Sequence, residues 1–256
     1  MRILAVANQK GGVAKTTTAV NLAAEMARTG SRVLLLDFDP QQAATSAIFG
    51  NVEFEPSAYH LLCEGVPASK IIQTSEAFGI DVIPSDIMLS SADLRLASVM
   101  GRETALAKAL RGLEYDLCII DTPPTLGLLS INALVAADEV LIPICPEYFS
   151  LKGIVLLEGT IQSVWEKLDA RVELLGVLVT RYQHRVITES ALEAIRQHFG
   201  SMVFDTIIPE NIRIEEAHNA HLPVWKYDPD CKGAAAYKEL ASAVIRRQKN
   251  KKRSPR

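Results

Sequence analysis

The feature that most constrains the fold of this chain is a glycine-containing loop between a short apolar run and a helical pattern. The apolar run covers residues 3–7, the loop covers residues 8–14, and helical periodicity begins near Lys15. Gly11 and Gly12 allow a tight turn and a close approach of the backbone to a ligand. The N-terminal end of the following helix favours an anion. We therefore predict a strand, a phosphate-binding loop and a helix in succession.

Two side chains at the start of this helix suit the phosphates of a nucleoside triphosphate. Lys15 is placed to reach the β and γ phosphates, and the Thr16 hydroxyl is a suitable hard ligand for Mg²⁺. The common pattern G-x-x-x-x-G-K-S/T fails, because Gln9 and Ala14 occupy the two outer glycine places. If Ala14 needs a positive φ, the strain costs on the order of 1 kcal/mol or more, and we expect slow turnover.

The loop matches a different pattern, K-G-G-x-x-K-S/T, which resembles the deviant Walker A motif of the ParA/MinD ATPases. This resemblance implies a Mg²⁺-dependent ATPase. It also implies that Lys10 crosses a dimer interface and touches the phosphates bound by the other subunit, so that Lys10 and Lys15 both act in catalysis. The loop residues expected at the nucleotide are Lys10, Gly11, Gly12, Val13, Ala14, Lys15, Thr16 and Thr17.

The rest of the chain alternates short β-branched runs with helical periodicity, which is typical of a parallel sheet with helices on both faces. The predicted strands are residues 3–7, 33–36, 80–83, 117–121, 140–144 and 174–180, and the clearest predicted helices are residues 16–29 and 187–199. A chain of 256 residues that is 48% hydrophobic can bury a substantial core. We predict one α/β domain over residues 1–248, with a P-loop NTPase-like, mostly parallel twisted sheet.

Two acidic motifs follow predicted strands, where α/β sheets place their ligands. The segment 37–41 resembles the D-x-D-P-Q switch of ParA/Soj proteins, which implies that Asp39 orients or activates the attacking water and that Asp37 supports the magnesium shell. The following run, 41–46, departs from the family run, which has Gly-Asn before Ala-Thr-Ser. Asp121 closes an apolar run and begins a match to the family's I-I-D-x-P-P-x-L-G-L-L, so we expect it to hold Mg²⁺ through water.

A later segment, 207–217, resembles the Soj run I-P-R-N-V-R-L-S-E-A. The resemblance implies that Pro209 and Asn211 lie by the adenine. It also implies that Arg185 and Arg213 bind DNA without sequence preference, as phosphate contacts do. Glu210 stands where an arginine is usual, which weakens the local positive field. The alternative for an arginine in such a loop is a solvated surface side chain.

The charge of the chain is unevenly distributed. The net charge is −3, but the lysines and arginines after residue 245 carry +7, which leaves −10 for residues 1–245. We predict that residues 249–256 form a disordered basic tail that could strengthen attachment to nucleic acid. The four cysteines form no C-x-x-C pair, which favours a reducing cytosol, and no apolar run approaches membrane-spanning length. We expect a soluble, cytoplasmic and nucleoid-associated protein without stable membrane insertion.

The ParA/Soj resemblance covers residues 2–247 and implies a partitioning ATPase. Its ATP-bound sandwich homodimer would bind nucleoid double-stranded DNA without sequence preference. A ParB-like or other cargo adaptor would stimulate hydrolysis and release it, thereby positioning chromosome or plasmid DNA or another cargo.

Two alternatives remain open. A MinD-like membrane-associated ATPase should end in an amphipathic helix with bulky apolar residues opposite lysines, whereas residues 233–247 carry mainly alanines there. A metabolic P-loop enzyme that uses ATP to activate a carboxylate should neither need Lys10 nor dimerise on ATP. Sedimentation with and without ATP separates the metabolic alternative from a partitioning ATPase.

Overall fold

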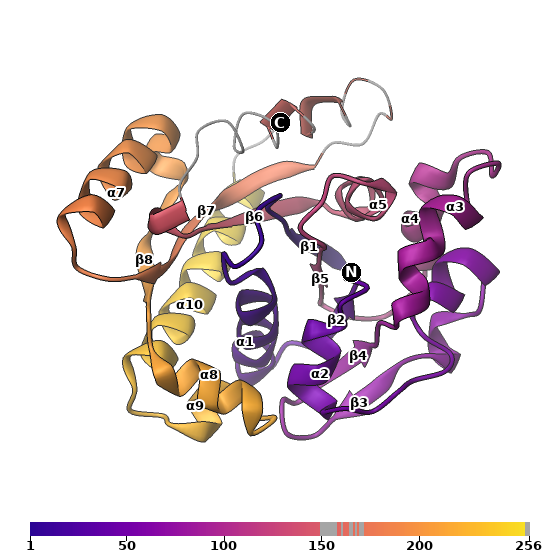
Figure 1. Cartoon of the computed structure of the whole chain (residues 1–256), viewed down its shortest axis with the longest axis horizontal. Helices are drawn as coiled ribbons and strands as arrows, with labels where there is room; N and C mark the ends of the chain where they lie inside the picture. The colour runs from indigo at the N-terminus through magenta and orange to yellow at the C-terminus, as the bar shows by residue number, and fades with distance from the viewer. Residues whose placement is uncertain (149–157, 160, 164–165, 167, 169–171, 254–256) are drawn as a thin grey trace.

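A computed structural model of the chain describes residues 1–148, 158–159, 161–163, 166, 168 and 172–253. Its strands are β1 Arg2–Val6, β2 Val33–Asp37, β3 Gln73–Ser75, β4 Ile80–Ile83, β5 Leu117–Asp121, β6 Glu139–Ile144, β7 Glu173–Tyr182 and β8 Val203–Pro209. Within the described residues these eight strands form one sheet in the order β3-β4-β2-β5-β1-β6-β7-β8 (Figure 1). All neighbouring strands are parallel except β3 and β4, which confirms the predicted mostly parallel α/β sheet.

Helices connect most of these strands. The α-helices are α1 Lys15–Arg28, α2 Ala43–Phe49, α3 Ala92–Arg95, α4 Ala105–Ala109, α5 Leu128–Ala136, α7 Val186–Phe199, α8 Ile212–Asn219, α9 Val224–Tyr227 and α10 Lys232–Arg253. Shorter helical turns are η1 His60–Glu64, η2 Ala68–Lys70, η3 Ile87–Ser91, η4 Arg102–Thr104, η5 Pro146–Tyr148 and η6 Gly200–Met202. In the described part of the chain, none of the helices carries an apolar stretch of the length needed to cross a bilayer.

Both faces of the sheet are covered, because successive side chains of a strand point to opposite sides. In β2, Val33 and Leu35 pack in the same core as α1 and α10, whereas Leu34 and Leu36 pack with α4 and α5. Figure 1 shows α1 and α10 on one side of the sheet and α5 on the other. The continuous apolar runs of the central strands therefore reflect burial on both faces.

The structure differs from the predictions at two strands and at the C-terminus. Strands β3 and β8 were not predicted; β3 has the sequence Gln-Thr-Ser, which lacks any apolar run. The expected disordered tail is also wrong as far as Arg253, because α10 continues to that residue. No proline or glycine interrupts residues 234–253, so the helix has no sequence signal to end earlier.

Arg247 fastens the last part of α10 to the sheet. Its Nη1 donates to two carbonyl oxygens at 2.8 Å, its Nη2 donates to two more at 3.1 and 2.9 Å, and its guanidinium lies 3.8 Å from the centre of the Phe204 ring. The four acceptors are the carbonyl oxygens of Leu175, Ser201, Met202 and Val203. A Cβ at Gly176 would lie 2.2 Å from Nη1, so this glycine makes room for the guanidinium. Arg247 is therefore an anchor of the fold, although it contributes to the basic C-terminus.

Candidate nucleotide-binding site

The carboxyl ends of three neighbouring strands bring the predicted site residues together. Val6 at the end of β1 and Asp37 at the end of β2 are both in register with Asp121 at the end of β5. The Phe38 N–H donates to the Asp121 carbonyl at 3.0 Å and so joins the switch segment to β5. Because the loop after β1 begins at the same edge, the phosphate loop, the switch and Asp121 form one site.

The phosphate loop is held in a tight turn by backbone conformation and by its neighbours. Gly12 has φ 73° and Ala14 has φ 59°, both in the left-handed region. The Asn8 side chain donates to the Pro143 carbonyl at 2.7 Å and accepts from the Lys10 N–H at 3.0 Å. A Cβ added at Gly11 or Gly12 would meet no atom of the described residues within 4 Å, so the space beside the loop is open to them. The positive φ of Ala14 is the condition under which the sequence predicted strain.

Lys15 begins α1 inside this loop, 7% exposed. Its ammonium Nζ donates to the Lys10 carbonyl at 3.0 Å, which closes the loop on itself. Burial lowers the pKa of Lys15, while the charges of Asp121 and Asp39 raise it and thus oppose that effect. The site therefore holds a buried cation within reach of two carboxylates, as a binding site for anionic phosphates with a metal ion requires.

Asp37 is fully buried and fully engaged by neighbouring groups. Its Oδ2 accepts from both the N–H and the hydroxyl of Thr45 at 2.7 Å, and its Oδ1 accepts from the Asp39 N–H at 3.2 Å. Burial raises the pKa of Asp37 to about 6, although these hydrogen bonds lower it in part. Thr45 and Ser85 support this arrangement, since Thr45 Oγ1 accepts from the Ser85 N–H at 2.9 Å. Sequence reasoning missed both roles; the Ala-Thr-Ser run was the available signal for Thr45.

Asp39 lies in the loop between β2 and α2 and is 7% exposed. Its Oδ1 accepts from the Gln41 N–H at 3.0 Å, and its carbonyl accepts from the Ser85 hydroxyl at 2.8 Å. The main chain at Asp39 is therefore fixed to the end of β4. Gln42, which is the N-cap residue of α2, has φ 57°, so the segment that departs from the family run holds a second non-glycine residue in the left-handed region.

Asp121 has the opposite character from Asp37. It is fully buried, and within the described residues neither carboxylate oxygen accepts a hydrogen bond of good distance and angle. Burial, the largest cause, and the charge of the neighbouring Asp37 raise the pKa of Asp121, while the Thr16 hydroxyl and the charge of Lys15 lower it. A buried carboxylate without donors is costly unless a cation neutralises it. These oxygens and the Thr16 hydroxyl are the hard ligands, direct or through water, that Mg²⁺ uses beside nucleotide phosphates, so the residues present fit this metal.

The end of β7 contacts the phosphate loop and links it to the residue that follows β8. Arg181, at the end of β7, donates from Nη1 to the Gly12 carbonyl at 3.3 Å and pairs through Nη2 with Glu210 at 3.1 Å. Pro209 ends β8, and the Asn211 side chain caps α8 by accepting from the Arg213 N–H at 2.9 Å. The predicted adenine-side residues, Pro209 and Asn211, therefore flank Glu210, which is linked to the loop through Arg181.

The two predicted DNA contacts are exposed but paired with acids of the chain. Arg185 is 58% exposed at its side chain, and its Nη1 lies 2.9 Å from Glu147 Oε1. Arg213 is 50% exposed, and it pairs with Glu216 at 2.7 Å and with Asp228 at 3.3 Å. Any phosphate contact at these arginines must compete with exposed ion pairs, which are typically weak.

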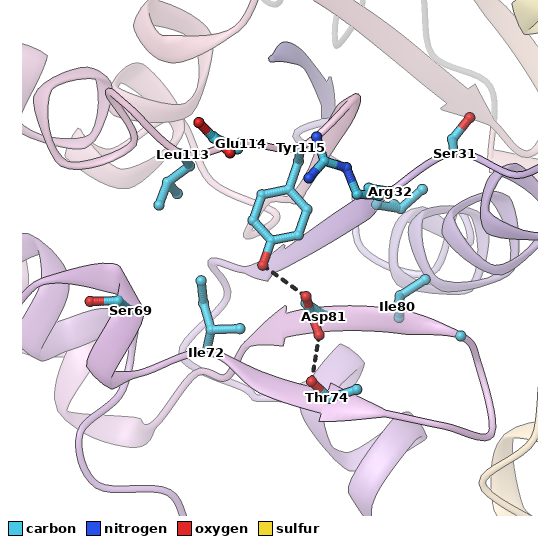
Figure 2. Close-up of a pocket in the computed structure, with 12 residues that line it drawn as sticks. Ser31, Arg32, Ser69, Ile72, Thr74, Ile80, Asp81, Leu113, Glu114 and Tyr115 are labelled. Atoms are coloured by element: carbon cyan, nitrogen blue, oxygen red, sulfur yellow. Dashed lines mark hydrogen bonds between the residues drawn. The ribbon is translucent and has the colours of Figure 1, made fainter.

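A separate cavity of about 580 Å³ opens at the opposite edge of the sheet, near the beginnings of β2, β4 and β5. Figure 2 shows that Asp81 points into it and is bonded on both sides. Thr74 Oγ1 donates to Asp81 Oδ1 at 2.6 Å, and the Tyr115 hydroxyl donates to Oδ2 at 2.8 Å. None of the predicted nucleotide-binding residues lines this cavity, so it is not part of the nucleotide site.

Comparison with known proteins agrees with this geometry. The profile of the family described as AAA domain matches residues 1–174. The chain is 44% identical over 248 residues to the chromosome-partitioning ATPase Soj of Thermus thermophilus, which covers 96% of each chain. It is 40% identical to the chromosome partitioning protein ParA of Caulobacter vibrioides, over 98% of this chain and 96% of that protein.

Solved structures show the same fold. A cobyrinic acid a,c-diamide synthase from Mycobacterium smegmatis, with bound ADP and magnesium, superposes with a TM-score of 0.86 at 34% identity, over 100% of this chain and 98% of that one. Apo McdA from Cyanothece superposes with a TM-score of 0.84 at 28% identity, over 96% of this chain and 99% of that one. By its sequence and its fold, the chain belongs to the ParA/Soj family of partitioning ATPases and is itself an ATPase.

Proposed function

We propose that the chain binds ATP with Mg²⁺, forms an ATP-bound sandwich homodimer, and in that state binds duplex DNA without sequence preference. Hydrolysis stimulated by a ParB-like protein or another cargo adaptor releases it from DNA. The output is the positioning of chromosome or plasmid DNA, or of another cargo, on the nucleoid in the cytoplasm. Its similarity to ParA and Soj over nearly the whole chain supports this proposal.

The dimer proposal rests on the different environments of Lys10 and Lys15 in the phosphate loop. Lys15 is buried and bonded within its own loop, whereas the Lys10 side chain is exposed. A buried lysine serves the phosphates bound by its own subunit. An exposed lysine on the same loop can reach phosphates across a subunit interface, as the deviant Walker A pattern implies.

Sedimentation with and without Mg·ATP tests this division. Lys15→Ala should abolish ATP binding and with it the dimer. Lys10→Ala should leave ATP binding by the monomer measurable and remove ATP-dependent dimerisation. Lys108→Ala, which changes an exposed lysine of α4, is the matched control and should behave as the parent. A full ATP dimer of Lys10→Ala would show that Lys10 is only a loop residue.

The structure argues against the MinD-like alternative at the C-terminal helix. A membrane-binding helix must keep its bulky apolar residues free to enter the lipid surface. In α10, Tyr237, Leu240 and Val244 are each 0% exposed, and they pack in the core shared with α1. ATP-dependent flotation with anionic liposomes, combined with no DNA binding, would favour the MinD-like function instead.

The metabolic alternative has one observation in its favour, the 34% identity to a cobyrinic acid a,c-diamide synthase. Such an enzyme would use ATP to activate a carboxylate within one subunit. The sedimentation experiment decides between the two functions, because only the partitioning ATPase requires Lys10-dependent assembly on ATP. A monomer at saturating Mg·ATP would favour the metabolic enzyme.

A further inference from the structure

Thr180 and Arg181, which belong to none of the predicted motifs, donate hydrogen bonds to carbonyl oxygens of the phosphate loop. Arg181 Nη1 donates to the Gly12 carbonyl at 3.3 Å. The neighbouring Thr180 hydroxyl donates to the Val13 carbonyl at 3.0 Å and is fully buried. Consecutive carbonyl groups of the loop are therefore bonded to the end of β7, a strand that contributes nothing else to the predicted motif.

The direction of these bonds matters for anion binding. A phosphate loop binds its ligand through backbone N–H groups, and those groups must converge on the anion. Side-chain donors that hold the carbonyl oxygens of the same loop limit rotation of its peptide planes. They also satisfy acceptors that would otherwise compete for the N–H groups or face the phosphates. The bonds from Thr180 and Arg181 thus favour a loop already arranged for phosphate.

Arg181 is itself held in an unusual conformation. Its φ is 50°, which a non-glycine residue keeps only when surrounding contacts over-determine it. Glu210 Oε1 lies 3.1 Å from Arg181 Nη2, and the Glu210 N–H donates to the Tyr182 carbonyl at 3.1 Å. The acid that replaces the usual arginine of the family run therefore orients Arg181 rather than only weakening a positive field.

We propose that Arg181 is a positioning residue of the nucleotide site and that Glu210 acts through it. Arg181 fixes the Gly12 carbonyl and adds a positive charge beside the phosphate loop, and Glu210 keeps the guanidinium in the orientation that reaches the loop. This inference rests on the proposal that the loop binds the phosphates of ATP. It predicts energetic coupling between residues 181 and 210 in nucleotide affinity.

A double-mutant cycle measures this coupling. The variants are Arg181→Met, Glu210→Gln and the double variant, and the measurement is titration with a fluorescent ATP analogue and Mg²⁺ at a concentration where the protein is monomeric. Arg181→Met should raise the Kd about fivefold, which corresponds to about 1 kcal/mol. Glu210→Gln should raise it in the parent protein but not in the Arg181→Met background. In steady-state hydrolysis, KM should rise with kcat changed less than about twofold.

The Arg102–Glu103 pair provides a matched control. Its atoms are also 3.1 Å apart and its side chains are 39% and 29% exposed, against 38% and 32% for Arg181 and Glu210. Arg102→Met and Glu103→Gln should leave the Kd unchanged. An additive cycle at residues 181 and 210, or equal shifts in the control pair, would overturn the inference.

Two further measurements separate the possible causes of a changed Kd. The melting temperature without nucleotide should stay near that of the parent in the residue 181 and 210 variants, because exposed ion pairs contribute little to stability. A large loss of melting temperature would mean that the pair only maintains the fold.

ATP binding by Lys15→Ala tests the phosphate loop itself. If that variant binds ATP as the parent does, the phosphate-loop assignment fails; if it loses binding while the cycle is additive, only the role of Arg181 fails.

Discussion

Asp37 and Asp121 lie side by side at the ends of β2 and β5, both fully buried, yet of the two only Asp37 accepts hydrogen bonds of good geometry from the described residues. Asp37 is bonded to Thr45 and to the Asp39 main chain, so it organises the switch segment. The carboxylate oxygens of Asp121 accept no such bond from the described residues. We therefore propose that Asp121, more than Asp37, receives the cation and that Asp37 mainly supports the structure around it.

The first prediction concerns Asp121→Asn. This change removes a buried carboxylate that accepts no well-formed hydrogen bond from the described residues, so the unfolding free energy of the nucleotide-free protein should stay level or rise. If Asp121 acts on Mg²⁺ through water, the affinity for Mg²⁺ in the presence of ATP should fall by about 10- to 100-fold. Isothermal titration with Mg²⁺ and ATP measures this.

Asp81→Asn, in the cavity at the other edge of the sheet, is the control for Asp121→Asn and should leave Mg²⁺ affinity unchanged. If Asp121→Asn binds Mg²⁺ as tightly as the parent protein does, Asp121 does not belong to the metal site.

The second prediction concerns pH. The pKa of Asp37 is raised from 3.8 to about 6 in the folded protein, chiefly by burial. The protonated carboxyl therefore favours folding: this contribution is complete below about pH 3.8 and is lost as pH rises through about 6. Asp37→Asn should gain melting temperature over the parent as pH rises from 5 to 7. A constant difference across that range would contradict the assignment.

The third prediction tests the strain at Ala14. A left-handed conformation costs an alanine about 1–2 kcal/mol, and the greater freedom of glycine in the unfolded chain offsets part of the gain. Ala14→Gly should raise the unfolding free energy by roughly 0.5–1 kcal/mol, and turnover should increase if strain limits it. Ala27→Gly, in the last turn of α1, should instead lower the unfolding free energy, by up to about 1 kcal/mol. Equal losses in both variants, measured by urea unfolding, would show that Ala14 is not strained.

The fourth prediction concerns Asp39, whose proposed role is to position water. Asp39→Ala removes the bond from the Gln41 N–H but leaves the Ser85 bond to its carbonyl. Hydrolysis should fall by about 10²- to 10⁴-fold while ATP binding persists, so the ATP-bound dimer should accumulate. Phosphate release and sedimentation measure the two quantities, with Asp230→Ala as an exposed control. A parental rate of hydrolysis would exclude this role for Asp39.

The fifth prediction uses the acids that pair with the proposed DNA contacts. Arg185→Glu or Arg213→Glu should weaken binding to all duplex sequences alike and flatten the salt dependence. Glu147→Gln frees Arg185 from its partner and should tighten DNA binding by up to about fivefold at low salt, the range of an exposed ion pair.

Glu193→Gln, on α7, serves as a charge-matched control for Glu147→Gln. If DNA affinity changes neither with the charge reversals at Arg185 and Arg213 nor with salt concentration, these arginines do not form the DNA interface.

The sequence alone predicted the parts of the site that depend on local chemistry. Glycines that permit a tight turn, an apolar run before them and Lys15 after them determine a strand, a loop and a helix within one continuous segment. Asp37 and Asp121 were placed at one edge of the sheet because each follows a buried parallel strand, and such strands end at the same edge. The bounds of the predicted strands agree with those of the structure within one or two residues, because each strand is a mainly apolar run.

Only the tertiary structure decided which groups meet across the chain. The hydrogen bond from Arg181 to Gly12, the pairing of Arg181 with Glu210, and the bonds from Arg247 that hold α10 to the sheet all join segments far apart in sequence. No local pattern encodes such contacts, because they depend on strand order and on the depth at which each side chain is buried. Hydrogen bonds and desolvation at those positions, rather than residue type, assign each charged group its role.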